Sequence, residues 1–308
     1  RTLARVWLKA PSFRARDSLS VMRVTNALFA AALAKLEQGS DKRGFHITMP
    51  TRITANEFKL EDLKIVKEGA HPSKEFRIFY EYPVNGEMAR ISAWHDIPFR
   101  AGYSQVEKGL PTFHFVCEIP RGTTAKMEIN KEHELNPIAQ DLKKGELRFY
   151  KYKPEAGSVV NYGAIPQTWE SPDTPDELTK IGGDNDPIDV VQLNSRPCEM
   201  GEVYPVRILG GLALVDGGET DWKLIVVDDR DAETKSWFDV KDVPVERVSE
   251  IREWFRMYKT AEGKGENKFG LNEEAVDATV AKKVAVETFQ QWKLLVGEFK
   301  DHLSRKEL

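Results

Sequence analysis

The sequence feature that most constrains this chain is an acidic turn that leads directly into an apolar run. Asp184, Asp186 and Asp189 place three carboxylates within six residues. Pro187 fixes its own φ and disfavours helix at Asp186, so we expect a rigid turn that enters a strand. Carboxylates this close repel one another unless a cation lies among them, and hard divalent ions take oxygen ligands. An isolated acidic cluster is usually a solvated loop, so a metal site is predicted only if the rest of the chain supplies matching groups.

Two further stretches carry charged side chains that could share a cavity with this turn. Asp216 and Asp221 lie at the ends of two expected strands that a glycine-containing turn joins. Lys126 and Glu128 alternate along another expected strand, so both side chains project from one face. The remaining candidates are Glu118, Arg148, Tyr162, Lys223, Tyr258 and Lys259. Carboxylates that hold metal ions, together with lysine, arginine and tyrosine for phosphate oxygens, form the combination that phosphoryl transfer needs.

The composition is that of a soluble globular protein, and it argues against several classes. Of 308 residues, 41% are hydrophobic and 31% are charged, and the net charge of −4 does not favour a nucleic-acid partner. The longest apolar run near the N-terminus, residues 27–34, is far shorter than the ~20 residues that cross a bilayer. Cys117 and Cys198 cannot form a disulfide framework and are too few for a zinc site, which fits best a reducing compartment or one where thiols do not matter.

From about residue 74 the pattern is that of many short strands separated by Gly, Pro and Asp turns. Expected strands at 76–82 and 91–94 flank Asn85-Gly86, a strong hairpin signal. Further strands are expected at 113–119, 125–129, 203–209, 212–215 and 224–227. Helices are expected at 248–257 and, with an amphipathic pattern, from about 274 to 303. The pattern predicts a mainly β protein with α elements (α+β), built on a closed barrel.

Residues 1–60 are expected to form a separate, small helical module. The stretches 24–29 and 53–58 resemble each other, and each is similar to the second half of an EF-hand loop. Counted back, the two loops would begin at Asp17 and His46, and they offer too few carboxylates for the roughly six to eight oxygens that calcium takes. The module is therefore either a pair of degenerate EF-hands or a plain helical hairpin.

Several motifs together resemble one family. Residues 183–190, Gly-Asp-Asn-Asp-Pro-Ile-Asp-Val, match the signature of the family I soluble inorganic pyrophosphatases. The resemblance is to the eukaryotic branch and extends over nearly everything after about residue 71, including 95–98, 118–121, 161–164, 218–223 and 253–259. It implies a catalytic domain over 71–308, a five-stranded OB-like barrel with flanking helices, and hydrolysis of inorganic diphosphate to two orthophosphates. It also implies about three or four Mg²⁺ ions per site, with Mn²⁺ or Zn²⁺ as substitutes and Ca²⁺ as an inhibitor.

The resemblance also implies a role for each candidate residue. The implied metal ligands are Glu118, Glu128, Asp184, Asp189, Asp216 and Asp221. Asp186 matches the family's general base, which takes a proton from a water that bridges two metal ions and is acidified by them. The phosphoryl group under attack would contact Lys126 and Tyr162, and the departing phosphate would contact Arg148, Tyr258 and Lys259. Lys223 would be a further substrate contact in the same cavity.

Two departures from the yeast-type pattern bear on assembly. Gly122 stands where a Trp of the familiar dimer contact is expected, and the His expected shortly before Asn161 is absent, so that dimer is not assumed. The EF-hand-like extension is similar to that of the soluble pyrophosphatases of the kinetoplastid acidocalcisome. That subgroup implies a homo-oligomer, either a dimer or a tetramer, in the acidocalcisome; the cytoplasm is the alternative location.

Two other functions would use the same features. A short-chain polyphosphate hydrolase acting on tripolyphosphate would need only a more open side for the departing phosphate. A non-enzymatic OB barrel that binds nucleic acid or another anion would need a basic groove with exposed aromatic side chains. Carboxylates at a barrel rim repel a phosphate backbone, so the leading hypothesis is a metal-dependent diphosphatase whose partner is a small molecule, with no nucleic acid and no membrane.

Overall fold

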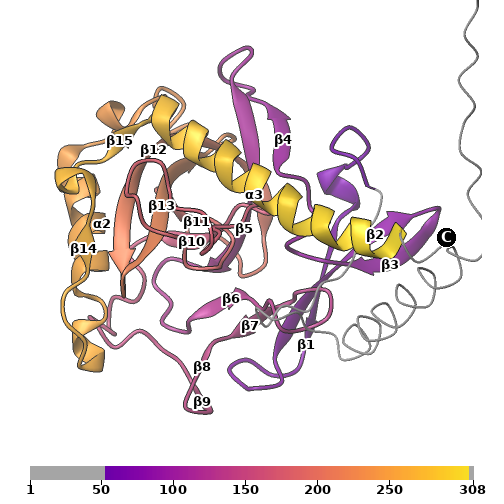
Figure 1. The fold of residues 1–308 in the computed structure, drawn as a ribbon, viewed down its shortest axis with the longest axis horizontal. Helices are drawn as coiled ribbons and strands as arrows, with labels where there is room; N and C mark the ends of the chain where they lie inside the picture. Colours follow the sequence, from indigo (N-terminus) through magenta and orange to yellow (C-terminus); the bar gives the residue numbers. More distant parts are fainter. Residues whose placement is uncertain (1–52, 305–308) are drawn as a thin grey trace, which may run out of the picture.

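A closed five-stranded barrel forms the centre of the computed structural model, which describes residues 53–304 (Figure 1). The barrel strands are β5 (Pro111–Ile119), β10 (Asn161–Ala164), β11 (Asp189–Gln192), β12 (Val203–Asp216) and β13 (Glu219–Asp228). They pair in the cyclic order β12–β13–β11–β10–β5–β12. The β11–β13 pair is parallel and the other four pairs are antiparallel. This confirms the mainly β fold with an OB-like barrel that the sequence predicts.

A second sheet and several short elements surround the barrel. The second sheet contains β1 (Lys64–Glu68), β2 (Arg77–Val84), β3 (Glu87–Ile91), β6 (Met127–Ile129) and β7 (Ile138–Gln140). Barrel strands also pair with β4 (Arg100–Tyr103), β14 (Lys268–Phe269) and β15 (Val276–Asp277), while β8 (Leu142–Lys143) pairs only with β9 (Glu146–Leu147). The helices are α2 (Val245–Met257), α3 (Ala278–Ser304) and the 3₁₀ turns η1 (Leu60–Asp62), η2 (Val240–Asp242), η3 (Thr260–Glu262) and η4 (Leu271–Glu273).

Both faces of the barrel strands are buried, because helices and the second sheet cover them. Along β13, Leu224 and Val226 belong to one apolar cluster, whereas Ile225 and Val227 belong to another. The long helix α3 crosses the barrel (Figure 1) and contributes to the first cluster Ala281, Val284 and Ala285. The second cluster includes α2 through Ile251, Trp254 and Phe255. Burial on both faces specifies the strand register, which in turn aligns the polar residues at the strand ends.

Most predicted elements are confirmed, with shifted ends. Asn85-Gly86 joins β2 to β3 as expected, but residues 92–94 lie outside the strand. The two strands expected at 203–209 and 212–215 form the single strand β12, with a register shift before Gly210. A Cβ at Gly210 would lie 2.5 Å from the Val276 carbonyl, so glycine permits the close approach of β15. The short strand β15 occupies the start of the expected last helix, which therefore begins at Ala278.

Residues 1–52 lie outside the described part of the chain, and with them most of the predicted module 1–60. From residue 53 the chain packs on the second sheet. Phe58 stacks on Tyr82 with ring centroids 4.9 Å apart, and the Lys59 amide donates to the Tyr82 hydroxyl at 2.8 Å. Between residues 53 and 304, none of the helices is long and apolar enough to cross a membrane.

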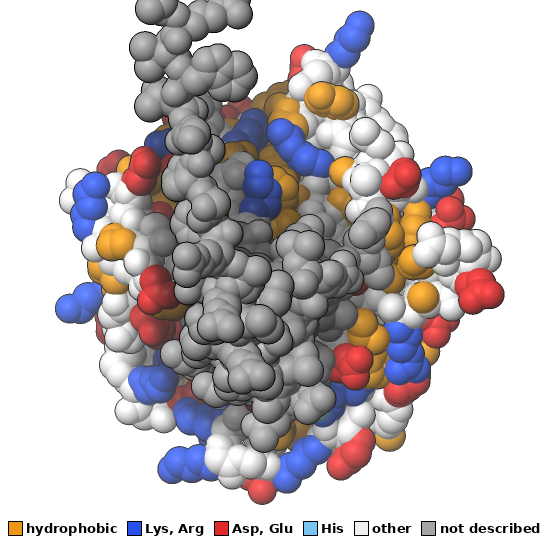
Figure 2. Space-filling model, turned by 45° about the vertical axis from the view of Figure 1, so that its right-hand side comes forward, with side chains coloured by type: hydrophobic (Ala, Val, Ile, Leu, Met, Phe, Trp, Pro, Cys, Tyr) orange, Lys and Arg blue, Asp and Glu red, His pale blue; other side chains and the backbone are white. Residues whose placement is uncertain are grey.

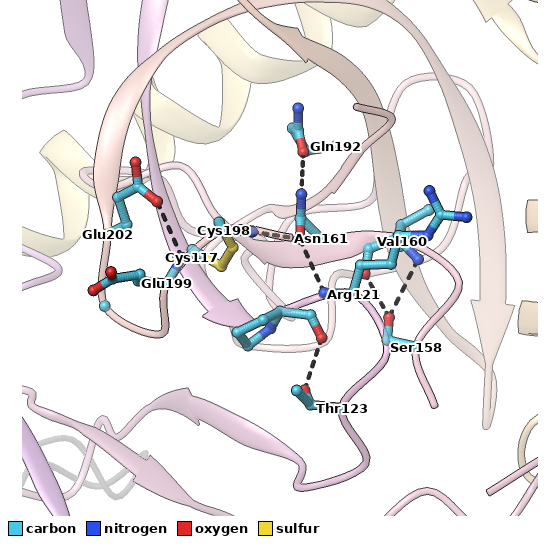
Figure 3. Close-up of a disulfide and its surroundings, with 12 residues drawn as sticks. Cys117, Arg121, Thr123, Ser158, Val160, Asn161, Gln192, Cys198, Glu199 and Glu202 are labelled. Atoms are coloured by element: carbon cyan, nitrogen blue, oxygen red, sulfur yellow. Dashed lines mark hydrogen bonds between the residues drawn. A yellow bond between two sulfur atoms is a disulfide. The ribbon is translucent and has the colours of Figure 1, made fainter. Parts of the chain in front are cut away.

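The two cysteines form one disulfide, which the sequence analysis did not predict (Figure 3). It joins Cys117 on β5 to Cys198 in the loop after β11, and both residues are buried. The Cys117 amide also donates to the Glu202 carbonyl at 2.9 Å. Asn161 Oδ1 accepts from the amides of Arg121 at 2.9 Å and Cys198 at 3.0 Å. The disulfide therefore lies in a network that connects three segments beside the barrel strands β5 and β10.

Charged side chains of both signs are interspersed over the described part of the face in Figure 2. Large apolar side chains with high exposure are Tyr103, Val245 and Leu294, which belong to β4, α2 and α3. A denser group of acidic and basic side chains lines a cavity of the molecule.

Candidate active site

One cavity of about 320 Å³ brings together all thirteen candidate residues from the sequence. Its acidic lining consists of Glu118, Glu128, Asp184, Asp186, Asp189, Asp216, Glu219 and Asp221. Its cations and hydroxyls are those of Lys126, Arg148, Tyr162, Lys223, Tyr258, Lys259 and Lys264. These residues span about half of the chain, so their meeting depends on closure of the barrel.

The register of the barrel strands explains why the central side chains meet. Asp189 pairs with Lys223 in the parallel β11–β13 ladder, and Tyr162 on β10 lies opposite Val191 of β11. Asp221 and Lys223 are two residues apart on β13, so they project from the same face. Strand pairing thus brings together the Asp189 carboxylate, the Lys223 ammonium group and the Tyr162 hydroxyl from three neighbouring strands.

Lys223 is the buried cation at the centre of the site. Its ammonium group donates to Asp189, to Asp221 and, at 3.3 Å, to the Tyr162 hydroxyl. Burial alone would lower the pKa of Lys223, but Asp189 and Asp221 hold it well above its usual value. Burial raises the pKa of Asp189 to about 6, although Lys223 opposes that change. One lysine therefore compensates two carboxylates, Asp189 and Asp221.

The acidic turn is clamped by the segment 169–171. The Asn185 amide donates to the Glu170 carbonyl at 2.9 Å, and the Glu170 amide donates to the Asp186 carbonyl at 2.9 Å. The Trp169 indole donates to Asn185 Oδ1 at 3.1 Å. Asn185 has a φ of 73°, a left-handed conformation that asparagine tolerates. A Cβ at Gly183 would lie 2.4 Å from the Glu170 carbonyl group, so only glycine allows this close approach.

The acidic side of the cavity has the chemistry of a divalent-cation site. Carboxylate oxygens of Glu170, Asp184 and Asp221 lie within 4.8 Å of one another. Burial raises the pKa of Glu170 and of Asp184 well above the usual range, and neighbouring carboxylates raise both further. Glu170 Oε2 is buried and has no hydrogen-bond partner within the described segment. An all-oxygen, acidic and under-compensated group of this kind fits a hard divalent cation.

The other side of the cavity is rich in cations that acidic side chains hold in place. Asp141 lies between Lys126 at 3.1 Å and Arg148 at 2.8 Å. Glu262 contacts the other side of the Arg148 guanidinium at 3.3 Å. Lys259 pairs with Asp216, and burial together with nearby cations lowers the pKa of Lys259 to about 8. This half of the cavity therefore presents positioned lysine and arginine side chains that can bind an anion.

Comparisons with known proteins agree with this geometry. The family model described as inorganic pyrophosphatase matches residues 115–293. The chain is 43% identical over 235 residues to the inorganic pyrophosphatase of Homo sapiens, which covers 75% of this chain and 78% of the human protein. The chain belongs to the inorganic pyrophosphatase family. Within that family it is also 39% identical over 282 residues to the mitochondrial inorganic pyrophosphatase 2 of Mus musculus, covering 86% of this chain and 82% of the mouse protein.

Solved pyrophosphatase structures share the fold. The N-terminally truncated vacuolar soluble pyrophosphatase of Trypanosoma cruzi, in complex with PPi, has a TM-score of 0.71 and 38% identity, covering 76% of this chain and 90% of that chain. A recombinant inorganic pyrophosphatase of Trypanosoma brucei brucei has a TM-score of 0.72 and 34% identity, covering 78% of this chain and 72% of that chain. The resemblance to eukaryotic pyrophosphatases is therefore confirmed.

The pyrophosphatase site contains two acids that the sequence analysis missed. Glu170 follows Trp169, and Asp141 stands directly before a short hairpin. Neither side chain lines the cavity itself: Glu170 lies against Asp184 and Asp221, and Asp141 pairs with Lys126 and Arg148, contacts that only the tertiary structure creates. Glu170 is the first acid after the Asn161–Ala164 motif, and that position is the signal the sequence offered.

Proposed function

We propose that this chain hydrolyses inorganic diphosphate to two orthophosphates in the cavity described above. The observation that carries the proposal is the convergence of all thirteen predicted residues on one cavity, whose lining combines carboxylates with lysine, arginine and tyrosine side chains. Family membership supports the same reaction, and the related Trypanosoma cruzi structure is titled as a complex with PPi.

The divalent cations would be held by the acidic side of the cavity. We assign the ligands to Asp184, Asp189 and Asp221, with Asp216, Glu128 and Glu118 for further ions. The oxygen-only donor set favours Mg²⁺, with Mn²⁺ or Zn²⁺ as substitutes and Ca²⁺ as an inhibitor because its looser coordination misplaces the reacting groups. When bound, the cations neutralise phosphate charge and acidify a water molecule.

We assign to Asp186 the role of taking the proton from the attacking water. Its side chain is 46% exposed and lines the cavity, while its backbone is clamped by Glu170. Lys126, Tyr162 and Lys223 would hold the phosphoryl group under attack. Burial raises the pKa of Tyr162 well above its usual value, so its hydroxyl stays protonated and donates a hydrogen bond without adding charge.

The departing phosphate would leave from the opposite side. Arg148 is held in place by Asp141 and Glu262, which presents its guanidinium to an anion at fixed geometry. Tyr258 and Lys259 follow α2 directly and both contact Asp216. Bond formation by water at one phosphorus and cleavage of the bridging oxygen bond then give two phosphates.

A second candidate activity is hydrolysis of tripolyphosphate in the same cavity. Lys264 favours it, because this exposed lysine lines the cavity and its amide donates to the Lys259 carbonyl at 3.3 Å. It adds positive charge near the site assigned to the departing phosphate. Release of phosphate from tripolyphosphate, measured with Mg²⁺ and then with Zn²⁺, tests this activity; a rate at background level with both ions would reject it.

The remaining assignments from the sequence stand as proposals. We propose a catalytic domain over residues 71–308 that follows the helical module 1–60, a homo-oligomer (dimer or tetramer), and residence in the acidocalcisome. Structural neighbours titled vacuolar soluble pyrophosphatases support that compartment, whereas the mouse relative is named mitochondrial. Light scattering and imaging of the tagged full-length protein test the assembly and the location.

The central experiment measures orthophosphate released from diphosphate with Mg²⁺. The wild-type chain should release two phosphates per diphosphate, and Asp186→Asn should lower kcat at least ~100-fold, as expected for loss of a general base. Glu155→Gln, which removes one exposed carboxylate, is the matched control and should retain the wild-type rate. A wild-type chain without turnover would overturn the proposed function, and an active Asp186→Asn variant would overturn the assignment of the base.

A further inference from the structure

Lys131 is a charged residue beside the active site for which the mechanism above has no role. It follows β6 in the segment 130–137, and it is not one of the residues that line the cavity. We propose that Lys131 is a positioning residue for Asp186: it holds one carboxylate oxygen from outside the cavity and leaves the other to accept the proton of water. This inference rests on the proposed function, since it deepens the role given to Asp186.

Two contacts connect Lys131 to the base. Its ammonium group pairs with Asp186 Oδ1 and donates to the Asn185 carbonyl at 2.7 Å. The Lys131 side chain is 21% exposed, against 46% for Asp186. Lys131 therefore contacts the Asp186 carboxylate and, at the same time, the peptide group that precedes it.

Asp186 needs such a partner because only its backbone is otherwise fixed. The Glu170 amide holds its carbonyl at 2.9 Å, and its own amide donates to Asp184 Oδ1 at 3.0 Å. The side chain is half exposed, and the nearby carboxylates of Glu128 and Asp184 interact with it repulsively. A cation on one oxygen offsets this repulsion and selects one orientation, which a proton acceptor requires in order to face its water.

The segment that carries Lys131 is itself anchored. Asn130 Oδ1 accepts from the amides of Glu132 at 3.0 Å and His133 at 3.1 Å, which forms a local turn. Asn136 is fully buried, and its Oδ1 accepts from the Ser92 hydroxyl at 2.7 Å. Lys131 therefore extends from a turn that is fixed at both ends, which allows it to hold Asp186 at a defined position.

The test is a double-mutant cycle read by steady-state kinetics with diphosphate and Mg²⁺. Lys131→Met should lower kcat about 10- to 100-fold and change KM by less than about twofold, because the lysine acts on the base and not on substrate binding. Lys131→Arg, which keeps the charge, should recover most of that loss. In an Asp186→Asn background, Lys131→Met should lower the residual rate by less than about twofold, because the group it orients is gone.

The control is Lys108→Met, which removes the same charge from the exposed end of the β4–β5 hairpin. Equal kinetics of Lys131→Met and this control would overturn the inference. So would an equal loss from Lys131→Met in the wild-type and Asp186→Asn backgrounds, which would indicate a structural role. If Lys131→Met does not fold, Lys131→Arg and Lys131→Gln provide the same comparison. The wild-type rate tests the proposed function separately, because an inactive wild type rejects that function before any Lys131 variant is compared.

Discussion

His95 provides a stability prediction that is independent of the metal site. Its side chain is fully buried and stacks between Trp94 and Trp292. The Trp292 indole donates to His95 Nδ1 at 2.9 Å, so Nδ1 is an acceptor and the ring is neutral. Protonation of Nδ1 would set two N–H groups against each other in a fully buried site. Burial accordingly lowers the pKa of His95 to about 3 from 6.5.

The size and sign of the effect follow from linkage. Below pH 6.5 the unfolded chain binds a proton at His95, whereas the folded chain does not until about pH 3. The stability that the neutral His95 contributes is therefore fully present above pH 6.5 and is lost as the pH falls toward 3. At pH 5 the loss is about 2 kcal/mol, since each pKa unit corresponds to ~1.4 kcal/mol. His114, whose pKa burial lowers to about 4, acts in the same direction, so the assay must isolate His95.

Urea unfolding of the wild-type chain and of His95→Phe at pH 7.5 and pH 5.0 isolates the effect of His95. The free energy of unfolding of the wild-type chain should fall between these pH values by about 2 kcal/mol more than that of His95→Phe, which cannot be protonated. This difference cancels whatever stability the substitution itself costs. His71→Gln is the control, because His71 is exposed and should contribute much less. Equal pH dependence in wild type and His95→Phe would refute the reasoning.

Two further stability effects follow from the fold. Replacing Cys117 and Cys198 by Ala, or reducing their disulfide, opens a loop of 81 residues and should cost up to ~4.5 kcal/mol by loop-closure entropy; an unchanged guanidinium midpoint with reductant would contradict this. Arg207→Met should cost about 3–5 kcal/mol, because it leaves the buried Asp229 carboxylate, now 2.8 Å from Arg207, without its cation. The folded Arg207→Met variant should keep the wild-type kcat, and a large loss of kcat at a temperature where it is folded would count against that separation.

The candidate site was predictable where its residues lie in dense motifs. Asp184, Asp186 and Asp189 stand within six residues, and their spacing before an apolar strand already indicated a shared cavity. Glu170 and Lys131 were missed because they reach the site through contacts formed only in the folded chain. Local patterns report which side chains share a strand, but they do not report which loops meet at its end.

The fold was predictable to a similar degree. Alternating and aromatic-rich stretches located β2, β5 and β13, because their side chains pack on apolar clusters. The short strand β10 was not predicted, since four residues carry little periodicity and the ladder that stabilises it is non-local, whereas β11 follows the acidic turn as expected. The disulfide depends on a close approach of β5 and the loop after β11, which no local pattern around Cys117 or Cys198 indicates. Of the two EF-hand-like stretches, 24–29 lies outside the described part of the chain, whereas 53–58 lies within it.

The most direct test of the central claim is calorimetric titration of Mg²⁺ into the chelator-treated protein without substrate. If carboxylates from distant segments converge on cations, the wild-type chain should bind about two or more ions. Asp221→Asn, which removes a carboxylate in contact with Lys223 and close to Glu170 and Asp184, should lose at least one of them. Absence of binding by the wild type, or the same stoichiometry and affinity in Asp221→Asn, would contradict the account.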